Sequence, residues 1–300
     1  MIDFLAQIFT LSMFFAGLRM ATPLILASMG GILSERAGVI NIALEGMILT
    51  GAFFAVWGSY TTGNPWFGVL LAIISGMALA AIHAVVSVYF KADQVVSGTA
   101  INILATGLTV YLLQILFGVS GTSPRAVRLP QWDIGIVAFN PMVYIALISV
   151  PIIWVILYKT PWGLRIRAVG EHPQAADTVG INVNRWRFIC VTLSGAFAGL
   201  AGVAISIGEG SYFVNGMSSG RGFIALAAMI FGKWNPLGAL GASLLFGFTE
   251  AIALRATFQH IPSELVRTLP YVITIIVLAG FIGRARPPKA VGKPYNKGER

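Results

Sequence analysis

The residue types that most often carry catalysis or metal binding are few in this chain and far apart. The single cysteine, Cys190, lies in an apolar stretch, and neither an HExxH zinc motif nor a GxSxG nucleophile motif occurs. Gly232-Lys233 is followed by Trp234, not by the Ser or Thr of a phosphate-binding loop. The three histidines are scattered: His83, His172 and His260. We therefore expect no catalytic site, no metal site, no cofactor, and no ATP hydrolysis by this chain itself.

Polar side chains inside apolar stretches are the stronger chemical signal, because a charge at the centre of a membrane helix costs about 2.5–3.5 kcal/mol. Asn41 and Glu45 are four residues apart in a predicted span from Val39 to Trp57, which would direct both from one helix face. Asn102 and Thr106 repeat this spacing in a later span. These four residues are candidates for the lining of a substrate path. The alternative is that they form structural hydrogen bonds between helices.

The longest polar stretch runs from residue 159 to 187. Within it, residues 172–180 are typical of one short helix, because Pro173 suits the first helical position and Gly180 suits a left-handed stop. Five of the 20 basic residues lie in the stretch: Lys159, Arg165, Arg167, Arg185 and Arg187. We interpret this short helix as a rigid projection that a partner protein contacts in the cytoplasm.

The composition excludes a soluble globular domain, since 57% of residues are hydrophobic and only 10% are charged, against about 25% charged in such domains. Long unbroken apolar runs favour membrane helices of about 20 residues over transmembrane strands. We predict an all-α polytopic membrane protein with about nine transmembrane helices (range eight to ten) and broken or re-entrant segments. Residues 1–283 form one transmembrane domain, and residues 284–300 form a basic, disordered cytoplasmic tail.

Two segments depart from simple membrane spans. The first, from Phe4 to Leu33, contains Arg19 and Pro23, so it is either one kinked span or a surface helix followed by a span. The second is a short apolar piece between a Gly/Ser-rich connection at 209–222 and an Asn-Pro break, which suggests a half-helix or re-entrant segment. A last span is predicted at 269–282.

The distribution of basic residues predicts the orientation. With the N-terminus outside, 14 Lys and Arg residues fall in cytoplasmic loops and four fall outside, as the positive-inside rule requires. The C-terminus is then cytoplasmic. The same rule accounts for the net charge of +9, so no nucleic-acid partner is needed to explain it.

Several stretches together carry a family resemblance. They are Ala21-Thr22-Pro23-Leu24, Gly31 to Met47, Val96 to Asn102, Arg167 to Glu171 and Gly220 to Ala239. On these residues the chain resembles the inner-membrane permease subunits of bacterial ABC importers, in the branched-chain amino acid and simple-sugar permease superfamily. Within it, the chain is most similar to nucleoside-type permeases that work with lipoproteins of the basic membrane protein class.

The resemblance implies a coupling function for the short helix. Glu171, Ala175, Ala176 and Gly180 match the motif that docks on the ATPase subunit, and Pro173 and Asp177 lie in the same helix. We expect Ala176→Arg to uncouple transport. The resemblance also implies two ATPase subunits in trans, a second permease subunit, and an external substrate-binding lipoprotein, all at a phospholipid membrane. The stretch from Glu35 to Glu45 resembles the family's region near the translocation path.

The resemblance favours a nucleoside as the transported solute, and a simple sugar or branched-chain amino acid stays open within the same superfamily. An ion-coupled secondary transporter is a second alternative, motivated by the broken helices and by Glu45. An intramembrane enzyme is a third alternative, which requires convergent catalytic groups that the sequence does not provide.

Overall fold

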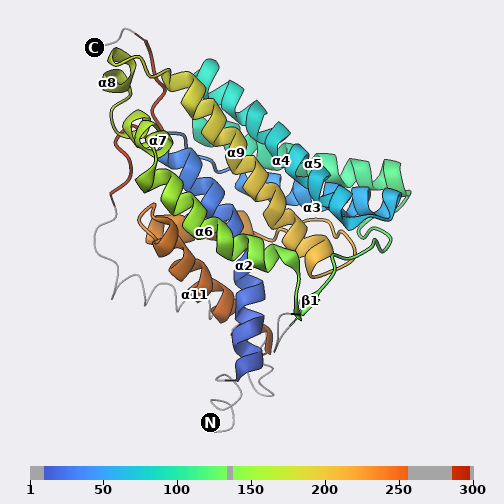
Figure 1. The fold of residues 1–300 in the computed structure, drawn as a ribbon. Helices are drawn as coiled ribbons and strands as arrows, with labels where there is room; N and C mark the ends of the chain where they lie inside the picture. Colours follow the sequence, from blue (N-terminus) through green and yellow to red (C-terminus); the bar gives the residue numbers. More distant parts are fainter. Residues whose placement is uncertain (1–9, 134–137, 256–285, 298–300) are drawn as a thin grey trace.

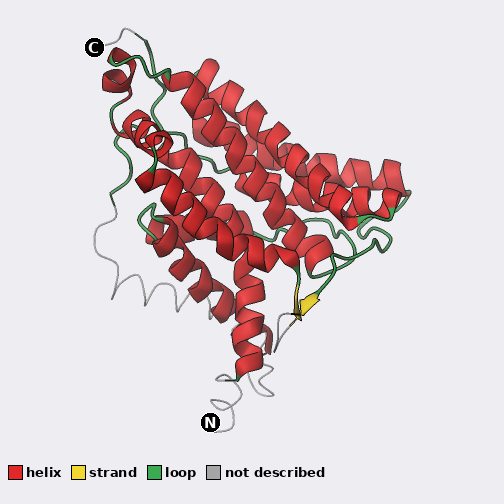
Figure 2. Ribbon diagram, in the orientation of Figure 1, coloured by secondary structure: helices red, strands yellow, loops and turns green. Residues whose placement is uncertain are grey.

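A computed structural model describes residues 10–133, 138–255 and 286–297, and these form a helical bundle (Figures 1 and 2). A two-residue antiparallel ladder pairs β1 with β2 and is the exception among the described residues. The elements in chain order are α2 (Leu11–Arg36), α3 (Leu44–Thr62), α4 (Pro65–Ala84) with the π-helical turn η1 (Val85–Tyr89), α5 (Gln94–Phe117), β1 (Trp132–Asp133), β2 (Ala138–Phe139), α6 (Pro141–Lys159), α7 (Pro161–Glu171), α8 (Pro173–Thr178), α9 (Val183–Val203) with the π-helical turn η2 (Ala204–Gly208), α10 (Arg221–Phe231) and α11 (Pro236–Arg255).

The helices begin where the sequence supplies caps. Asn64, Asp93, Asn140 and Asn182 each accept a hydrogen bond from a backbone N–H of the first turn of the helix that follows. Proline occupies the first helical position of α4, α6, α7 and α8, where its missing N–H costs nothing. Local sequence therefore determines most of the helix starts.

Six of the described helices are long and apolar enough to cross a membrane, which confirms the all-α polytopic class. They are Leu11–Arg36, Pro65–Tyr89, Gln94–Phe117, Pro141–Lys159, Val183–Gly208 and Pro236–Leu254. The predicted number of about nine is not confirmed. The 19-residue helix α3 is not among the six, α10 is shorter, and the predicted span at 269–282 lies outside the described residues.

The first apolar segment is one continuous helix, α2, which contains both Arg19 and Pro23, the two residues that left open whether it is one span or two. Pro23 lies inside α2, and Arg19 lies 5.8 Å from the centroid of the Phe139 ring. The described part of this segment therefore supports a single span, and residues 1–9 lie outside the description.

Small residues bring α9 into close contact with α3 and α4. A β-carbon on Gly199 would collide with the Ala72 carbonyl, and one on Gly195 would collide with the carbonyl of Gly76. A β-carbon on Gly202 would meet the backbone of α3 in the same way. These glycines form a small-residue packing face on α9.

The chain connections gather at two opposite ends of the bundle. At one end, Arg36 donates to the carbonyls of Trp234 (3.0 Å) and Lys233 (3.4 Å), and α7, α8 and the C-terminal residues lie beside them (Figure 1). At the other end, backbone bonds join Ser123 to Phe213 (2.9 Å) and Leu129 to Ile207 (3.0 Å). We call the first the coupling end.

The predicted half-helix is present as α10. Its 11 residues span about 16 Å at 1.5 Å per residue, roughly half of a 30 Å hydrocarbon core. The connection at 209–220 precedes it, and a turn at 232–235 with positive φ at Lys233 and Trp234 leads from it into α11.

Candidate coupling helix and core polar network

The short helix predicted in the basic loop is α8. Pro173 is its first residue, and Gly180 has φ +83°, the left-handed conformation that glycine adopts without steric cost. The Ile181 N–H donates to the carbonyl of Ala176 at 3.0 Å, and the Gly180 N–H donates to that of Asp177 at 2.9 Å. This pair of bonds is a Schellman ending, so the predicted start and stop are both confirmed.

The two motif alanines face opposite ways. Ala175 is exposed, as are Gly180 and Val179, whose side chain is 74% exposed. Ala176 is 3% exposed and packs in a cluster with Val169, Val183 and Tyr295. Pro173 is also buried. The surface that a partner could contact thus includes Ala175, Val179 and Gly180, together with the exposed Gln174 and Thr178, whereas Ala176 holds α8 against the rest of the protein.

The base beneath α8 is built by the end of α7. A β-carbon on Gly170 would collide with the Arg36 carbonyl, so α7 lies directly against the end of α2. Glu171, the last residue of α7, accepts a hydrogen bond from the backbone N–H of Lys289 at 3.4 Å. The Glu171 carboxylate therefore contacts the C-terminal segment and belongs to the base of the site.

The prediction of a disordered tail is wrong for residues 286–297. The Ala290 N–H donates to the Gly170 carbonyl at 2.9 Å, and Arg187, which is 1% exposed, donates to the Lys293 carbonyl at 2.8 Å. The basic composition of the tail, with its Pro and Gly residues, predicts disorder. The segment docks through backbone hydrogen bonds, which composition cannot predict.

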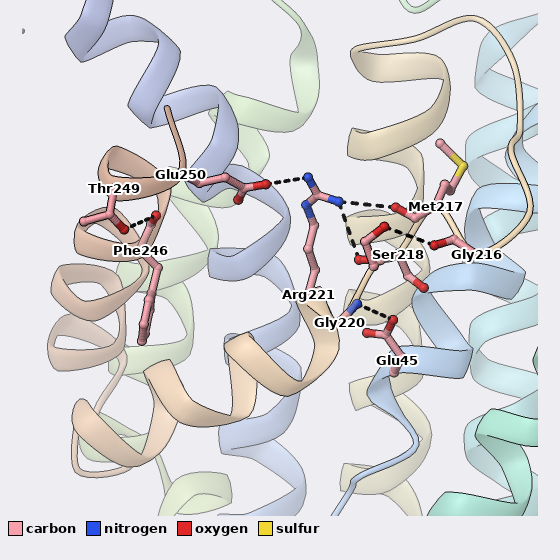
Figure 3. A network of polar contacts seen from close by, with 10 residues as sticks. Glu45, Gly216, Met217, Ser218, Gly220, Arg221, Phe246, Thr249 and Glu250 are labelled. Carbon is pink, nitrogen blue, oxygen red and sulfur yellow. Dashed lines mark hydrogen bonds and ion pairs between the residues drawn. The ribbon is translucent and has the colours of Figure 1, made fainter. Parts of the chain in front are cut away.

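A second polar constellation lies where α3, α10 and α11 meet (Figure 3). The two carboxylate oxygens of Glu45 accept from the backbone N–H groups of Gly220 and Gly222, each at 2.7 Å. These groups lie at the N-terminus of α10, where the helix dipole and unpaired N–H groups favour a negative charge. Glu45 therefore fixes the start of the half-helix to the first turn of α3.

Arg221 extends this network to α11. Its Nη2 lies 2.7 Å from the Glu250 carboxylate, and its Nη1 donates to the Met217 carbonyl at 3.2 Å (Figure 3). The two ion-paired side chains are 19% and 27% exposed. The pair was missed from the sequence, although a Gly-Arg-Gly start to a short apolar helix could have indicated it.

The prediction that Asn41 and Glu45 share a helix face is wrong. Helix α3 begins at Leu44, after an irregular segment that follows Gly38 with φ +94°. Asn41 lies in that segment and donates to the Ser194 hydroxyl at 2.6 Å, far from the partners of Glu45. The helical spacing argument fails because the break after α2 extends several residues further than the apolar pattern suggests.

Asn102 and Thr106 both lie in α5, four residues apart, as the spacing predicts. Asn102 accepts from the Gly46 N–H at 2.8 Å and donates to the Ile42 carbonyl at 3.0 Å, so it braces the first turn of α3. Thr106 is exposed, and its hydroxyl donates to the carbonyl of Asn102 within α5. Asn102 thus holds the chain between Asn41 and the start of α3, whereas Asn41 bonds to α9 and Glu45 bonds to the start of α10.

Glu35 and Trp234 form a clamp at the coupling end that sequence reasoning did not single out. The Trp234 indole N–H donates to the Glu35 carboxylate at 2.6 Å, and Arg36 binds the Trp234 carbonyl. The turn after α10 is thereby held to the end of α2. Both ends of the half-helix are thus joined to other helices by hydrogen bonds to charged side chains.

Membrane-length helices, an internal half-helix and a capped helix projecting at a basic end define the membrane subunit of a transporter. The chain matches the family described as the permease component of the branched-chain amino acid transport system over residues 13–278, and it belongs to that family. It is therefore a multi-pass ABC transporter permease of the inner membrane, the non-enzymatic component of such a system.

Curated relatives cover nearly the whole chain. The chain is 43% identical to the guanosine ABC transporter permease protein NupQ of Bacillus subtilis (strain 168), over 93% of this chain and 95% of that protein. It is 40% identical to the nucleoside ABC transporter permease protein NupC of Lactococcus lactis subsp. cremoris (strain MG1363), over 92% and 94%. It is 36% identical to the putative glucose ABC transporter permease protein TsgC13 of Haloferax volcanii, over 94% and 96%.

A more distant match bears on assembly. NupP, a second guanosine ABC transporter permease protein of the same Bacillus strain, is 28% identical over 94% of this chain and 84% of its own length. No solved structure matches the chain at a significant level.

Proposed function

We propose that this chain is the permease subunit of an ABC importer that moves a nucleoside into the cytoplasm. The observation that carries the proposal is α8, a short helix with a Schellman ending whose exposed surface includes Ala175 and, just after the helix, Val179 and Gly180. The names of two of the relatives reported above, NupQ and NupC, support a nucleoside as the solute.

ATP hydrolysis in separate subunits would drive the cycle, and α8 would receive the movement. In this proposal Ala175 and Gly180 contact the ATPase, and Pro173 and Ala176 anchor the helix to the base. Glu171 positions it through the C-terminal segment, because its carboxylate accepts a hydrogen bond from the Lys289 N–H, and the Asp177 carboxylate acts on Tyr295 of the same segment, whose pKa it raises. A six-residue helix is too short to be stable alone, so its anchoring determines whether it can transmit force.

The coupling end would face the cytoplasm. Arg36, Lys91 and Lys233 lie there with the basic residues of the loop at 159–187 and of the tail, whereas Arg125 and Arg128 lie at the other end. This distribution supports a cytoplasmic C-terminus and an external N-terminus.

The complete importer would contain a second permease subunit, ATPase subunits and an external substrate-binding lipoprotein. The presence of NupQ and NupP as two guanosine permease proteins of one strain supports a heterodimeric pairing. The exposed apolar side chains of α5 offer room for lipid or for the second permease.

The translocation path would pass beside the half-helix. Glu45, Asn41 and Asn102 shape it indirectly by fixing the starts of α3 and α10, because their polar groups are engaged within the chain. Thr106 and the partly exposed Arg221–Glu250 pair remain the candidates for contact with a solute. A paired charge suits a neutral, hydrogen-bonding solute better than a phosphate.

The test is Ala175→Arg in the complete transporter. We expect uptake of tritiated guanosine to fall at least about tenfold, because a long charged side chain on the exposed face of α8 blocks docking, while the amount of permease in the membrane stays unchanged. Ser120→Arg, an exposed position at the opposite end, is the control. Wild-type uptake by the Ala175 variant would refute the coupling assignment.

The alternatives have their own measurements. Competition of guanosine uptake by ribose, glucose or leucine would show a different substrate class. Uptake by proteoliposomes that contain this chain alone under an ion gradient would indicate a secondary transporter.

A further inference from the structure

We propose that residues 286–297, which we call the C-terminal strap, hold α8 in its coupling position, with Arg187 and Tyr295 as positioning residues. The inference rests on the proposed coupling function of α8. It goes beyond it by assigning a mechanical function to a segment that composition alone marks as a tail.

Backbone hydrogen bonds dock the strap to two helices. The Ala290 N–H donates to the Gly170 carbonyl at the end of α7, and the Gly292 N–H donates to the Gly38 carbonyl after α2, at 2.9 and 3.3 Å. The Lys289 N–H adds a bond to the Glu171 carboxylate. The strap therefore joins the residues that immediately precede α8 to the end of a membrane-spanning helix (Figure 1).

Arg187 anchors the middle of the strap. Its guanidinium is buried, with Nη1 donating to the Lys293 carbonyl at 2.8 Å and Nη2 donating to the Ala290 carbonyl at 3.5 Å. It lies against Gly38, where a β-carbon would be 2.8 Å from Nη2. Both acceptors of this buried charge come from the strap, so undocking would leave the charge without them, which is costly.

Tyr295 connects the strap to α8 itself. Its side chain is 7% exposed and packs with Val169 of α7, Ala176 of α8 and Val183 of α9. Burial, followed by the Asp177 carboxylate, raises the pKa of Tyr295, so the phenol stays protonated at neutral pH.

These contacts give α8 a rigid mounting. The helix is buried through Pro173 and Ala176, and the strap supplies the aromatic ring against Ala176. A push on the exposed face of α8 then reaches α2 through Gly38 and α9 through Arg187. Without the strap, the same push would move a six-residue helix in a loop.

The first experiment tests whether the strap is docked in membranes. Ala290 is 6% exposed and Lys289 is exposed, while the native Cys190 is 1% exposed and gives a low background. We expect maleimide to label Ala290→Cys at least about tenfold more slowly than Lys289→Cys. Equal labelling rates would overturn the proposal.

The second experiment tests positioning in the complete transporter. For Tyr295→Ala we expect guanosine uptake per permease molecule to fall about five- to thirtyfold, and uptake per ATP hydrolysed to fall as well, with the permease still present in the membrane. Tyr295→Phe keeps the packing ring and should retain most of the uptake. Lys297→Ala, exposed on the same segment, should have no effect.

The two measurements separate this inference from the coupling function. If Ala175→Arg abolishes uptake but Tyr295→Ala transports at the wild-type rate per molecule, the strap proposal is wrong, and the coupling function of α8 is retained. If the Tyr295→Ala variant loses uptake only because less permease reaches the membrane, with uptake per ATP hydrolysed unchanged, that result would also reject a positioning function. If neither substitution affects uptake, the coupling assignment itself fails.

Discussion

The coupling helix and the core polar network use polar residues in opposite ways. In α8, the start at Pro173 and the stop at Gly180 are set by residues within the helix or next to it. In the core, Glu45 binds amides that lie 175 and 177 residues further along the chain. The first arrangement can be anticipated from a few neighbouring residues, and the second cannot.

This difference indicates how each region tolerates change. The side chains of Ala175 and Val179 are exposed, so substitutions of these two residues should affect the partner contact alone. The carboxylate of Glu45 satisfies two backbone donors at the start of α10, which would lose their charged acceptor on substitution. Substitutions in the core network should therefore affect stability and transport together.

The largest effect is expected for Glu45→Ala. The Gly220 and Gly222 N–H groups would lose their charged acceptor, and we expect the free energy of unfolding to fall by about 2–4 kcal/mol. Reversible unfolding of the purified protein in detergent measures the change. Glu45→Gln, which keeps one amide oxygen as acceptor, should lose roughly half as much, and an Ala variant as stable as wild type would contradict the network.

Ala176→Leu sharpens the distinction between the two faces of α8. Overpacking the cluster around Tyr295 should cost about 1–3 kcal/mol locally and speed amide hydrogen exchange across residues 173–186. Ala175→Leu, on the exposed face, should leave exchange unchanged. Similar exchange in the two variants would mean that Ala176 is not an anchor.

The Arg221–Glu250 pair should contribute less than Glu45, because both side chains are partly exposed. We expect a coupling energy of about 1 kcal/mol from a double-mutant cycle with Arg221→Met and Glu250→Gln, between the values for surface and buried pairs. Guanosine uptake measured on the same variants would show whether the pair also lies on the solute path. If the effects of the two substitutions on the free energy of unfolding were strictly additive, Arg221 and Glu250 would not interact energetically.

The smallest effect is a pH dependence of the strap. Because the pKa of Tyr295 is raised in the folded protein, its stabilisation is complete below the ordinary value of about 10 and is lost as the pH rises through the folded value. Labelling of Ala290→Cys, normalised to Lys289→Cys, should therefore stay constant from about pH 6 to 9 and rise above about pH 10. The rise should be absent when Tyr295→Phe is added; an unchanged rise would point to another group.

Much of this protein could be predicted from its sequence. The apolar content gave the membrane class, because no soluble fold can hide so many hydrophobic side chains. Pro173 and Gly180 predicted α8, since both act through local backbone geometry.

Tertiary structure alone decided the partners of the polar residues. The spacing of Asn41 and Glu45 predicts one helix face, yet α3 begins only at Leu44, so Asn41 lies before the helix and Glu45 within it, and distant segments supply their acceptors and donors. The docking of the C-terminal strap could not be predicted from the sequence for the same reason. Its main hydrogen bonds are formed by backbone groups, which every residue has. Neighbouring residues determine where a helix starts and ends. The pairing of buried polar groups instead depends on which distant segments the packed helices bring together.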